Sequence, residues 1–166
     1  MNIRTATETD VPLILQFIKA LAEYERLADR VVATEDTIRS TLFGRPRFAE
    51  VLIAEDEGQP VGFALFFHNY STFLAQPGIY LEDLFVKPEA RGKGFGKALL
   101  ARLATIAKSR NCGRLEWAVL NWNQPSIDFY ESLGAKPMDE WKVYRLTGEA
   151  LDKLAERQKA GGSGQK

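Results

Sequence analysis

Cysteine and histidine are scarce in this sequence, which contains one residue of each type among its 166. A single cysteine, Cys112, excludes an internal disulfide framework. Cys112 and His68 are too few to form a structural zinc site, and they do not suggest a Cys/His nucleophile pair. We therefore expect a protein that holds no metal and works in a reducing compartment, the cytoplasm.

Long hydrophobic runs are also missing, because no apolar stretch approaches the roughly 18 residues that a membrane-spanning helix needs. Residues 1–4 lead into a strand-like stretch without a secretory pattern. These absences predict that the protein has no membrane partner. The length predicts one domain, which we assign to residues 1–158, and a flexible Gly- and Ser-containing tail at 159–166.

The chain has no net charge, but its charges are unevenly spread. Residues 91–114 carry seven basic side chains and no acidic one, which leaves 15 basic and 22 acidic residues elsewhere. One interpretation is the solvated face of a helix. The other is a basic region for an anionic cofactor and an acidic remainder for a cationic substrate. The basic stretch is short and the chain is neutral, so we expect no nucleic-acid partner.

Hydrophobic spacing and turn-forming residues predict an alternation of helices and strands. Strands are expected at 2–6, 51–55, 61–68, 79–86, 115–120 and 141–146. Helices are expected at about 7–21, 34–44, 94–110, 124–133 and 149–157. A helix pair, a run of antiparallel strands and a strand–helix–strand unit together predict an α+β fold, with helices flanking a central, partly open sheet.

The strongest motif follows the strand at 79–86. Pro88 breaks this strand, and residues 91–97 (Arg-Gly-Lys-Gly-Phe-Gly-Lys) open the next helix. Three alternating glycines allow a ligand to approach the backbone, and the amides of a helix N-terminus favour an anion. The segment has neither the full dinucleotide fingerprint nor a Gly-Lys-Ser/Thr phosphate loop. The alternative is that these glycines only tighten a turn.

This pattern resembles the Arg-x-x-Gly-x-Gly acetyl-CoA signature of the GCN5-related N-acetyltransferase superfamily, with Arg91, Gly94 and Gly96 at its three fixed positions. Residues 19–25, 80–86 and 122–130 further resemble the diamine (spermidine/spermine) acetyltransferase branch. The resemblance implies a GNAT-like three-layer αβα fold, whose mixed, mostly antiparallel sheet splays at the cofactor site. It also implies acetyl-CoA as the co-substrate and a homodimer.

The resemblance assigns the acetyl-CoA contacts to three segments. The backbone at the end of the strand would hold the thioester and polarise its carbonyl, the glycine loop would bind the pyrophosphate, and a later segment would border the CoA arm. The residues are Leu84, Phe85 and Val86; Arg91, Gly92, Lys93, Gly94, Phe95, Gly96 and Lys97; and Asn123, Gln124, Pro125 and Ser126. Asn123 and Ser126 could instead cap a helix.

Two catalytic residues follow from the resemblance. Tyr130 would supply a proton to the departing CoA thiolate, although it could also be a core aromatic beside Phe129. Glu82 would bind the amine and accept its proton, directly or through water, because a primary amine is mostly protonated at pH 7. Glu82 and Asp83 point to opposite faces in a regular strand, and a bulge would change which one faces the site. The other amine-binding candidates are Tyr24, Glu25, Asp83 and Glu140.

The sequence thus predicts an acetyl-CoA-dependent N-acetyltransferase that acts on a small cationic, polyamine-like or diamine-like amine in a ternary complex. One alternative is acetylation of thialysine or another basic amino-acid-like amine. A short stretch at 134–141 and the residues Glu116, Trp117 and Ala118 depart from the polyamine enzymes near the amine end. Another alternative, from a different class, is a non-catalytic acyl-CoA-binding regulatory module.

Overall fold

The computed structural model describes the backbone of residues 1–161 and the side chains of residues 1–157. The chain divides into two compact units, Met1–Val119 and Leu120–Lys166. Most of the predicted tail, residues 162–166, lies outside the described residues, and its first residues belong to the last helix.

The first unit contains a five-stranded mixed sheet in which the strands follow chain order. β1 to β4 pair antiparallel, and β5 runs parallel to β4. A two-residue turn, Glu57–Gly58, joins β2 to β3, and both residues have positive φ angles, as such hairpins require. The strands are β1 (Asn2–Thr5), β2 (Glu50–Asp56), β3 (Gln59–Ser71), β4 (Gln76–Val86) and β5 (Leu115–Trp117).

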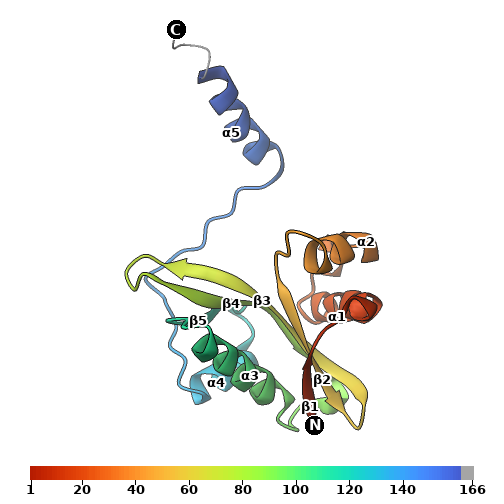
Figure 1. The fold of residues 1–166 in the computed structure, drawn as a ribbon. Coiled ribbons are helices and arrows are strands. Elements are labelled where there is room, and N and C mark those ends of the chain that lie inside the picture. Colours follow the sequence, from red (N-terminus) through yellow and green to blue (C-terminus); the bar gives the residue numbers. More distant parts are fainter. Residues whose placement is uncertain (162–166) are drawn as a thin grey trace. The chain divides into compact units, whose positions relative to one another are not determined.

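Helices cover both faces of this sheet (Figure 1). One face carries α1 (Val11–Tyr24) and α2 (Glu35–Ile38), which continues into the π-helical turn η3 (Arg39–Phe43); the other carries α3 (Phe95–Ser109). Short 3-10 turns η1 (Glu8–Asp10), η2 (Ala28–Arg30) and η4 (Pro88–Ala90) connect the elements. The α+β architecture predicted from the sequence is therefore confirmed.

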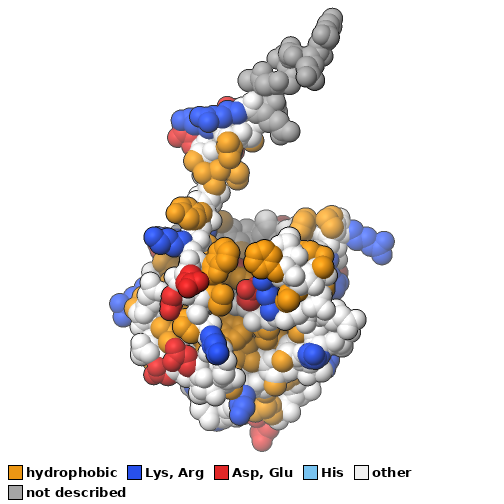
Figure 2. Space-filling model, turned by 90° about the vertical axis from the view of Figure 1, so that its left-hand side faces the viewer, with side chains coloured by type: hydrophobic (Ala, Val, Ile, Leu, Met, Phe, Trp, Pro, Cys, Tyr) orange, Lys and Arg blue, Asp and Glu red, His pale blue; other side chains and the backbone are white. Residues whose placement is uncertain are grey.

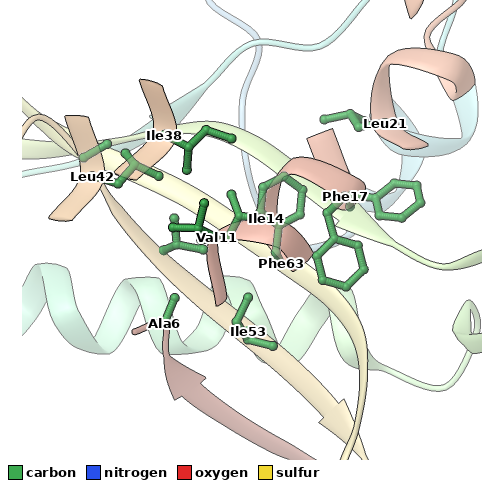
Figure 3. Close-up of a cluster of buried hydrophobic side chains, with 12 residues drawn as sticks. Ala6, Val11, Ile14, Phe17, Leu21, Ile38, Leu42, Ile53 and Phe63 are labelled. Carbon is green, nitrogen blue, oxygen red and sulfur yellow. The ribbon is translucent and has the colours of Figure 1, made fainter. Parts of the chain in front are cut away.

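The core between α1 and the sheet is built on aromatic contacts (Figure 3). Phe17 stacks on Phe63 with ring centroids 5.4 Å apart, and Phe85 lies 6.0 Å from Phe17. All three rings are buried, and a buried Phe side chain contributes roughly 1.5–3 kcal/mol. This packing fixes the position of α1 against β3 and β4, which carry the candidate site. The remaining cluster members are Ala6, Val11, Ile14, Leu21, Ile38, Leu42, Ala49, Val51 and Ile53.

The second unit contains two helices, α4 (Gln124–Ser132) and α5 (Gly148–Gly161). The strand expected at 141–146 does not form, so that prediction was wrong. A strand needs a neighbouring strand for its hydrogen bonds, and residues 120–161 contain no other strand. Trp141, Val143 and Tyr144 are consequently 70%, 87% and 91% exposed. β5 also ends at Trp117, three residues earlier than expected.

Among the described residues, no helix is long and apolar enough to cross a membrane.

Candidate functional site

The glycine loop connects the end of β4 to the start of α3. Gly92 and Gly94 adopt left-handed backbone conformations, with φ angles of 74° and 88°, which only glycine adopts at little cost. Gly94 is the N-cap of α3, and no side chain caps this helix. The first amides of α3 are therefore available to an anion, where the helix dipole also favours negative charge.

The loop has room for a phosphate group. A Cβ atom built on Gly92 meets no other atom within 4 Å. Lys93 is 58% exposed, and its Nζ lies 3.8 Å from Asp56 Oδ2. The Phe95 side chain is only 2% exposed and anchors the helix start in the core. Phe95 can therefore contribute only its backbone amide to cofactor binding. The loop therefore offers open space, backbone amides and lysine side chains, which are groups that suit a phosphate.

The Arg91 guanidinium is engaged within the protein. Its Nε donates a hydrogen bond to the Val86 carbonyl oxygen at 3.0 Å. Its Cζ lies 4.7 Å from the centroid of the Tyr24 ring and 5.9 Å from that of Phe85. Arg91 therefore connects the end of β4 to the end of α1, in addition to any contact with a phosphate.

The last residues of β4 have a strand neighbour on one side only. β5 pairs with residues 79–81 and goes no further, whereas β3 pairs with β4 up to Val86. Along residues 82–86 the edge away from β3 has no strand partner within the described sheet. Unpaired edge groups can hydrogen-bond an extended ligand as a further strand would. The predicted thioester contacts of Leu84, Phe85 and Val86 lie on this edge.

A β-bulge lies at the predicted acidic pair. Asp83 pairs with Leu65, and the next pair is Leu81 with Phe66, so Glu82 is the extra residue. Leu65 packs against the α1 core, and residues directly opposite in a sheet share a face. Asp83 therefore lies on the α1 face of the sheet, and the neighbouring Glu82 is exposed.

The carboxyl groups around this bulge influence one another. Burial, followed by the charges of Glu82 and Glu25, raises the pKa of Asp83 to about 6. Burial also raises the pKa of Glu25, which follows the last residue of α1. Three carboxyl groups from two elements thus act on one region, and such a region attracts a cation.

Tyr80 was not predicted as a site residue. Burial and the charges of Glu82 and Glu116 raise the pKa of its phenol. Its ring lies 5.3 Å from that of Phe67, with which it pairs across the sheet on the α1 face. Tyr80 and Asp83 share that face although they are three residues apart, because the bulge shifts the alternation. The sequence carries no direct signal for this shift.

The remaining predicted residues belong to the second unit. α4 begins at Gln124, with Pro125 in its first turn. The Asn123 side chain is buried and makes no capping hydrogen bond, and the Ser126 amide donates to the Asn123 carbonyl at 3.1 Å. The capping alternative is therefore not observed for Asn123. The rings of Tyr130 and Phe129 lie 5.4 Å apart, and Glu140 is exposed.

The structure thus brings Glu25, Tyr24, Asp83 and Arg91 together within the first unit, next to Glu82. The roles of these residues stay predictions, as do those of Tyr130, Glu140 and residues 123–126 in the second unit.

Comparison with known proteins decides the family. Residues 16–135 match the family model described as Acetyltransferase (GNAT) family. This chain belongs to that family. Members of the family use acetyl-CoA as the co-substrate, and the glycine loop described above lies inside the matched residues.

Curated relatives extend the match over nearly the whole chain. Thialysine N-epsilon-acetyltransferase of Bos taurus is 41% identical over 164 residues, covering 92% of this chain and 96% of that protein. L-ornithine N5-acetyltransferase of Arabidopsis thaliana is 36% identical over 198 residues, covering 92% and 87%. The chain is therefore an N-acetyltransferase, as its sequence predicted.

Solved structures agree with this family assignment. An integron cassette protein from the mobile metagenome of V. cholerae matches with a TM-score of 0.78 and 31% identity, covering 93% of this chain and 97% of that one. Ribosomal-protein-alanine N-acetyltransferase from Brucella melitensis has a TM-score of 0.71 at 22% identity, covering 89% and 100%. At that identity the second match supports the fold alone. The GNAT-like fold predicted from the sequence is confirmed.

Proposed function

We propose that this enzyme transfers the acetyl group of acetyl-CoA to the primary amine of a small, polyamine-like or diamine-like cation. One observation carries the proposal: the charges of Glu82 and Glu25 both act on the half-buried Asp83, which lies on the face of the sheet that packs against α1. A carboxyl group that folding makes costly to ionise gains most from a cationic ligand.

The proposed mechanism is direct transfer in a ternary complex, for which acetyl-CoA supplies the acetyl thioester. Glu82 accepts the proton of the bound ammonium group, directly or through water, and so frees the nitrogen lone pair. A backbone amide among Leu84, Phe85 and Val86 polarises the carbonyl and stabilises the developing oxyanion. The C–N bond forms, the attacking nitrogen releases its second proton to solvent water, the C–S bond breaks, and Tyr130 gives its proton to the departing thiolate and recovers one from solvent.

The glycine loop and the second unit supply the remaining cofactor contacts in this proposal. Lys93, Lys97 and the first amides of α3 neutralise the pyrophosphate. Asn123, Gln124, Pro125 and Ser126 border the CoA arm. Tyr24 and Glu25 line the distal end of the amine site, and Glu140 is a further candidate there. The single domain proposed for residues 1–158 includes residues of both units.

A second substrate class is favoured by the curated relatives. Thialysine and ornithine, named in two of them, carry an α-carboxylate that a polyamine lacks. A relative from Homo sapiens is named spermidine/spermine N(1)-acetyltransferase-like protein 1 and is 34% identical, with this chain covering 24% of its length. Basic amino acids thus carry one negative charge more than the corresponding diamines. The acidic region around Asp83 would repel this α-carboxylate.

A thiol-release assay with acetyl-CoA tests the proposal. The panel contains spermidine, spermine, putrescine, thialysine, lysine, ornithine and a peptide amine. Putrescine and ornithine form a matched pair, because they differ only by the α-carboxylate. We expect putrescine to give the higher kcat/KM; the reverse order would assign the enzyme to basic amino acids. No release with any amine would contradict the proposed transfer and favour an acyl-CoA-binding module.

The proposal includes a cytoplasmic homodimer. The exposed segment at 141–146 supports it, because Trp141, Val143 and Tyr144 have strong strand propensity and large apolar area. Hydrophobic side chains are visible along the second unit in Figure 2. A second copy of the chain would cover this segment and give it a strand neighbour.

Analytical ultracentrifugation tests the dimer. We expect a dimer for the natural chain and a monomer when Val143 and Tyr144 are both replaced by serine. Phe73→Ser is the matched control, because Phe73 is 95% exposed in the hairpin between β3 and β4. A monomeric natural chain would contradict the proposed assembly.

A further inference from the structure

The contacts of Arg91 place it between two parts of the site that the proposed function treats separately. Its backbone belongs to the cofactor loop, directly after η4. Its side chain turns back to the Val86 carbonyl oxygen and lies over the Tyr24 ring. Both contacts use the guanidinium group: its Nε donates to the carbonyl oxygen, and its Cζ lies over the phenol ring at 4.7 Å from the ring centroid.

The C-terminal end of α1 attracts a positive charge. The last turn of α1 contains no basic residue, so its C-terminal carbonyls lack a positive side chain from their own helix. Arg91 brings a positive charge over Tyr24, which is the last residue of α1. The next residue is Glu25, whose charge reaches Asp83 in β4.

We propose that Arg91 is a positioning residue for the amine side of the site: by clamping Tyr24, it holds Glu25 in place beside the bulge of β4. This inference rests on the proposed function, because it concerns the amine that the carboxyl groups attract. Under this inference Arg91 affects amine binding, which a residue that only binds phosphate would not do. Movement of the cofactor loop would thereby change the amine site.

Steady-state kinetics with the best amine of the panel separates this role from phosphate binding. Arg91→Met and Tyr24→Leu are each expected to raise the KM for the amine at least fivefold. Lys93→Met, which removes a charge from the same loop, is expected to raise the KM for acetyl-CoA only. Tyr24→Phe keeps the ring and should raise the amine KM less than Tyr24→Leu does.

A double variant tests whether the two side chains act together. If Arg91 acts through Tyr24, combining Arg91→Met with Tyr24→Leu raises the amine KM no more than the stronger single change. The proposal is overturned if the two effects multiply, or if Arg91→Met changes only the KM for acetyl-CoA, as Lys93→Met does.

A second measurement needs no turnover. NMR titration of the Asp83 carboxyl compares the natural protein with Arg91→Lys and Tyr24→Leu, neither of which changes the net charge. In both variants Glu25 should move away from Asp83, and the pKa of Asp83 should fall. Arg102→Lys on α3 is the control and should leave the pKa of Asp83 unchanged. This titration does not depend on turnover, so a failure to acetylate any amine would contradict the proposed function without deciding the role of Arg91. An unchanged Asp83 titration in both variants would still overturn the role of Arg91.

Discussion

Asp83 lies directly opposite Leu65 in the pairing of β3 with β4, while the next pair along is Leu81 with Phe66. This one-residue offset makes Glu82 the bulge residue and sends Asp83 to the face that α1 covers. The two adjacent carboxyl groups therefore differ in burial, and different environments give neighbouring carboxyl groups different tasks.

Replacing Asp83 by asparagine should stabilise the protein while weakening the enzyme. The fold raises the pKa of Asp83 to about 6, above its ordinary value, so folding favours the protonated form. Between about pH 4 and pH 6 the unfolded chain has released this proton and the folded chain retains it, so stability falls as pH rises. Above that window, Asp83→Asn should gain up to about 2 kcal/mol in the free energy of unfolding.

Urea denaturation at pH 4 and pH 7.5 measures this gain, which should be small at the lower pH. The exposed Asp139→Asn is the matched control and should change little at either pH. The same Asp83→Asn protein should show a lower kcat/KM for the amine at pH 7.5. A variant that is less stable than the natural protein at pH 7.5 would contradict the electrostatic interpretation.

Asp10 should stabilise the fold in the opposite pH window. Arg4 donates hydrogen bonds of 2.8 Å to both oxygens of Asp10, and this contact, opposed by burial, lowers the pKa of the carboxyl to about 2. Its stabilisation is present above about pH 4 and disappears as pH falls to about 2. Asp10→Asn should cost about 2 kcal/mol at pH 7 and progressively less below pH 4.

Thermal or urea unfolding across this range checks the Asp10 prediction. Glu8→Gln in the same turn is the control. The Glu8 side chain is 59% exposed, and its Oε1 lies 3.3 Å from Arg39 Nη1. Such a surface pair contributes at most about 1 kcal/mol. Equal losses from the two variants would show that burial of the Asp10 contact is unimportant.

Gly92→Ala should weaken CoA binding as well as lower stability. The positive φ of Gly92 makes any Cβ there cost roughly 1–2 kcal/mol, and relaxation of the loop would move the amides that face the pyrophosphate. We expect at least a tenfold rise in the Kd for CoA by calorimetry.

Gly58→Ala is the matched control for Gly92→Ala. Gly58 has a similar φ of 78° and open space around it, but it lies in the hairpin turn between β2 and β3. Its substitution should cost similar stability and leave the Kd for CoA unchanged. A comparable loss of CoA affinity in both variants would indicate a general effect on the fold.

Tyr130→Phe should lower the turnover number at least tenfold, because the phenol is proposed as the proton donor to the thiolate. CoA binding should persist, since the ring remains. Tyr70→Phe removes a phenol from a position in β3 that is 59% exposed and should leave turnover unchanged. Normal turnover in Tyr130→Phe would remove Tyr130 from the mechanism.

Local sequence signals were sufficient for much of this description. Hydrophobic periodicity located α1, α3 and the strands β1 to β4, because these elements each bury one face. The alternating glycines and Pro88 located the cofactor loop, because few residues tolerate its backbone angles. The strand expected at 141–146 failed because strand formation depends on a neighbour that the local pattern does not contain.

The family and the N-acetyltransferase activity could be predicted from residue spacing along the chain, as could the position of the proposed acetyl-CoA loop, since their signals lie in short motifs. Which carboxyl group faces α1, and what Arg91 contacts, depends on the folded structure. Asp83 reaches that face through a bulge set by its pairing with β3, and Arg91 meets Tyr24 because core packing brings the end of α1 to the end of β4. Pairing register and packing are non-local, so residue spacing along the chain could not reveal them.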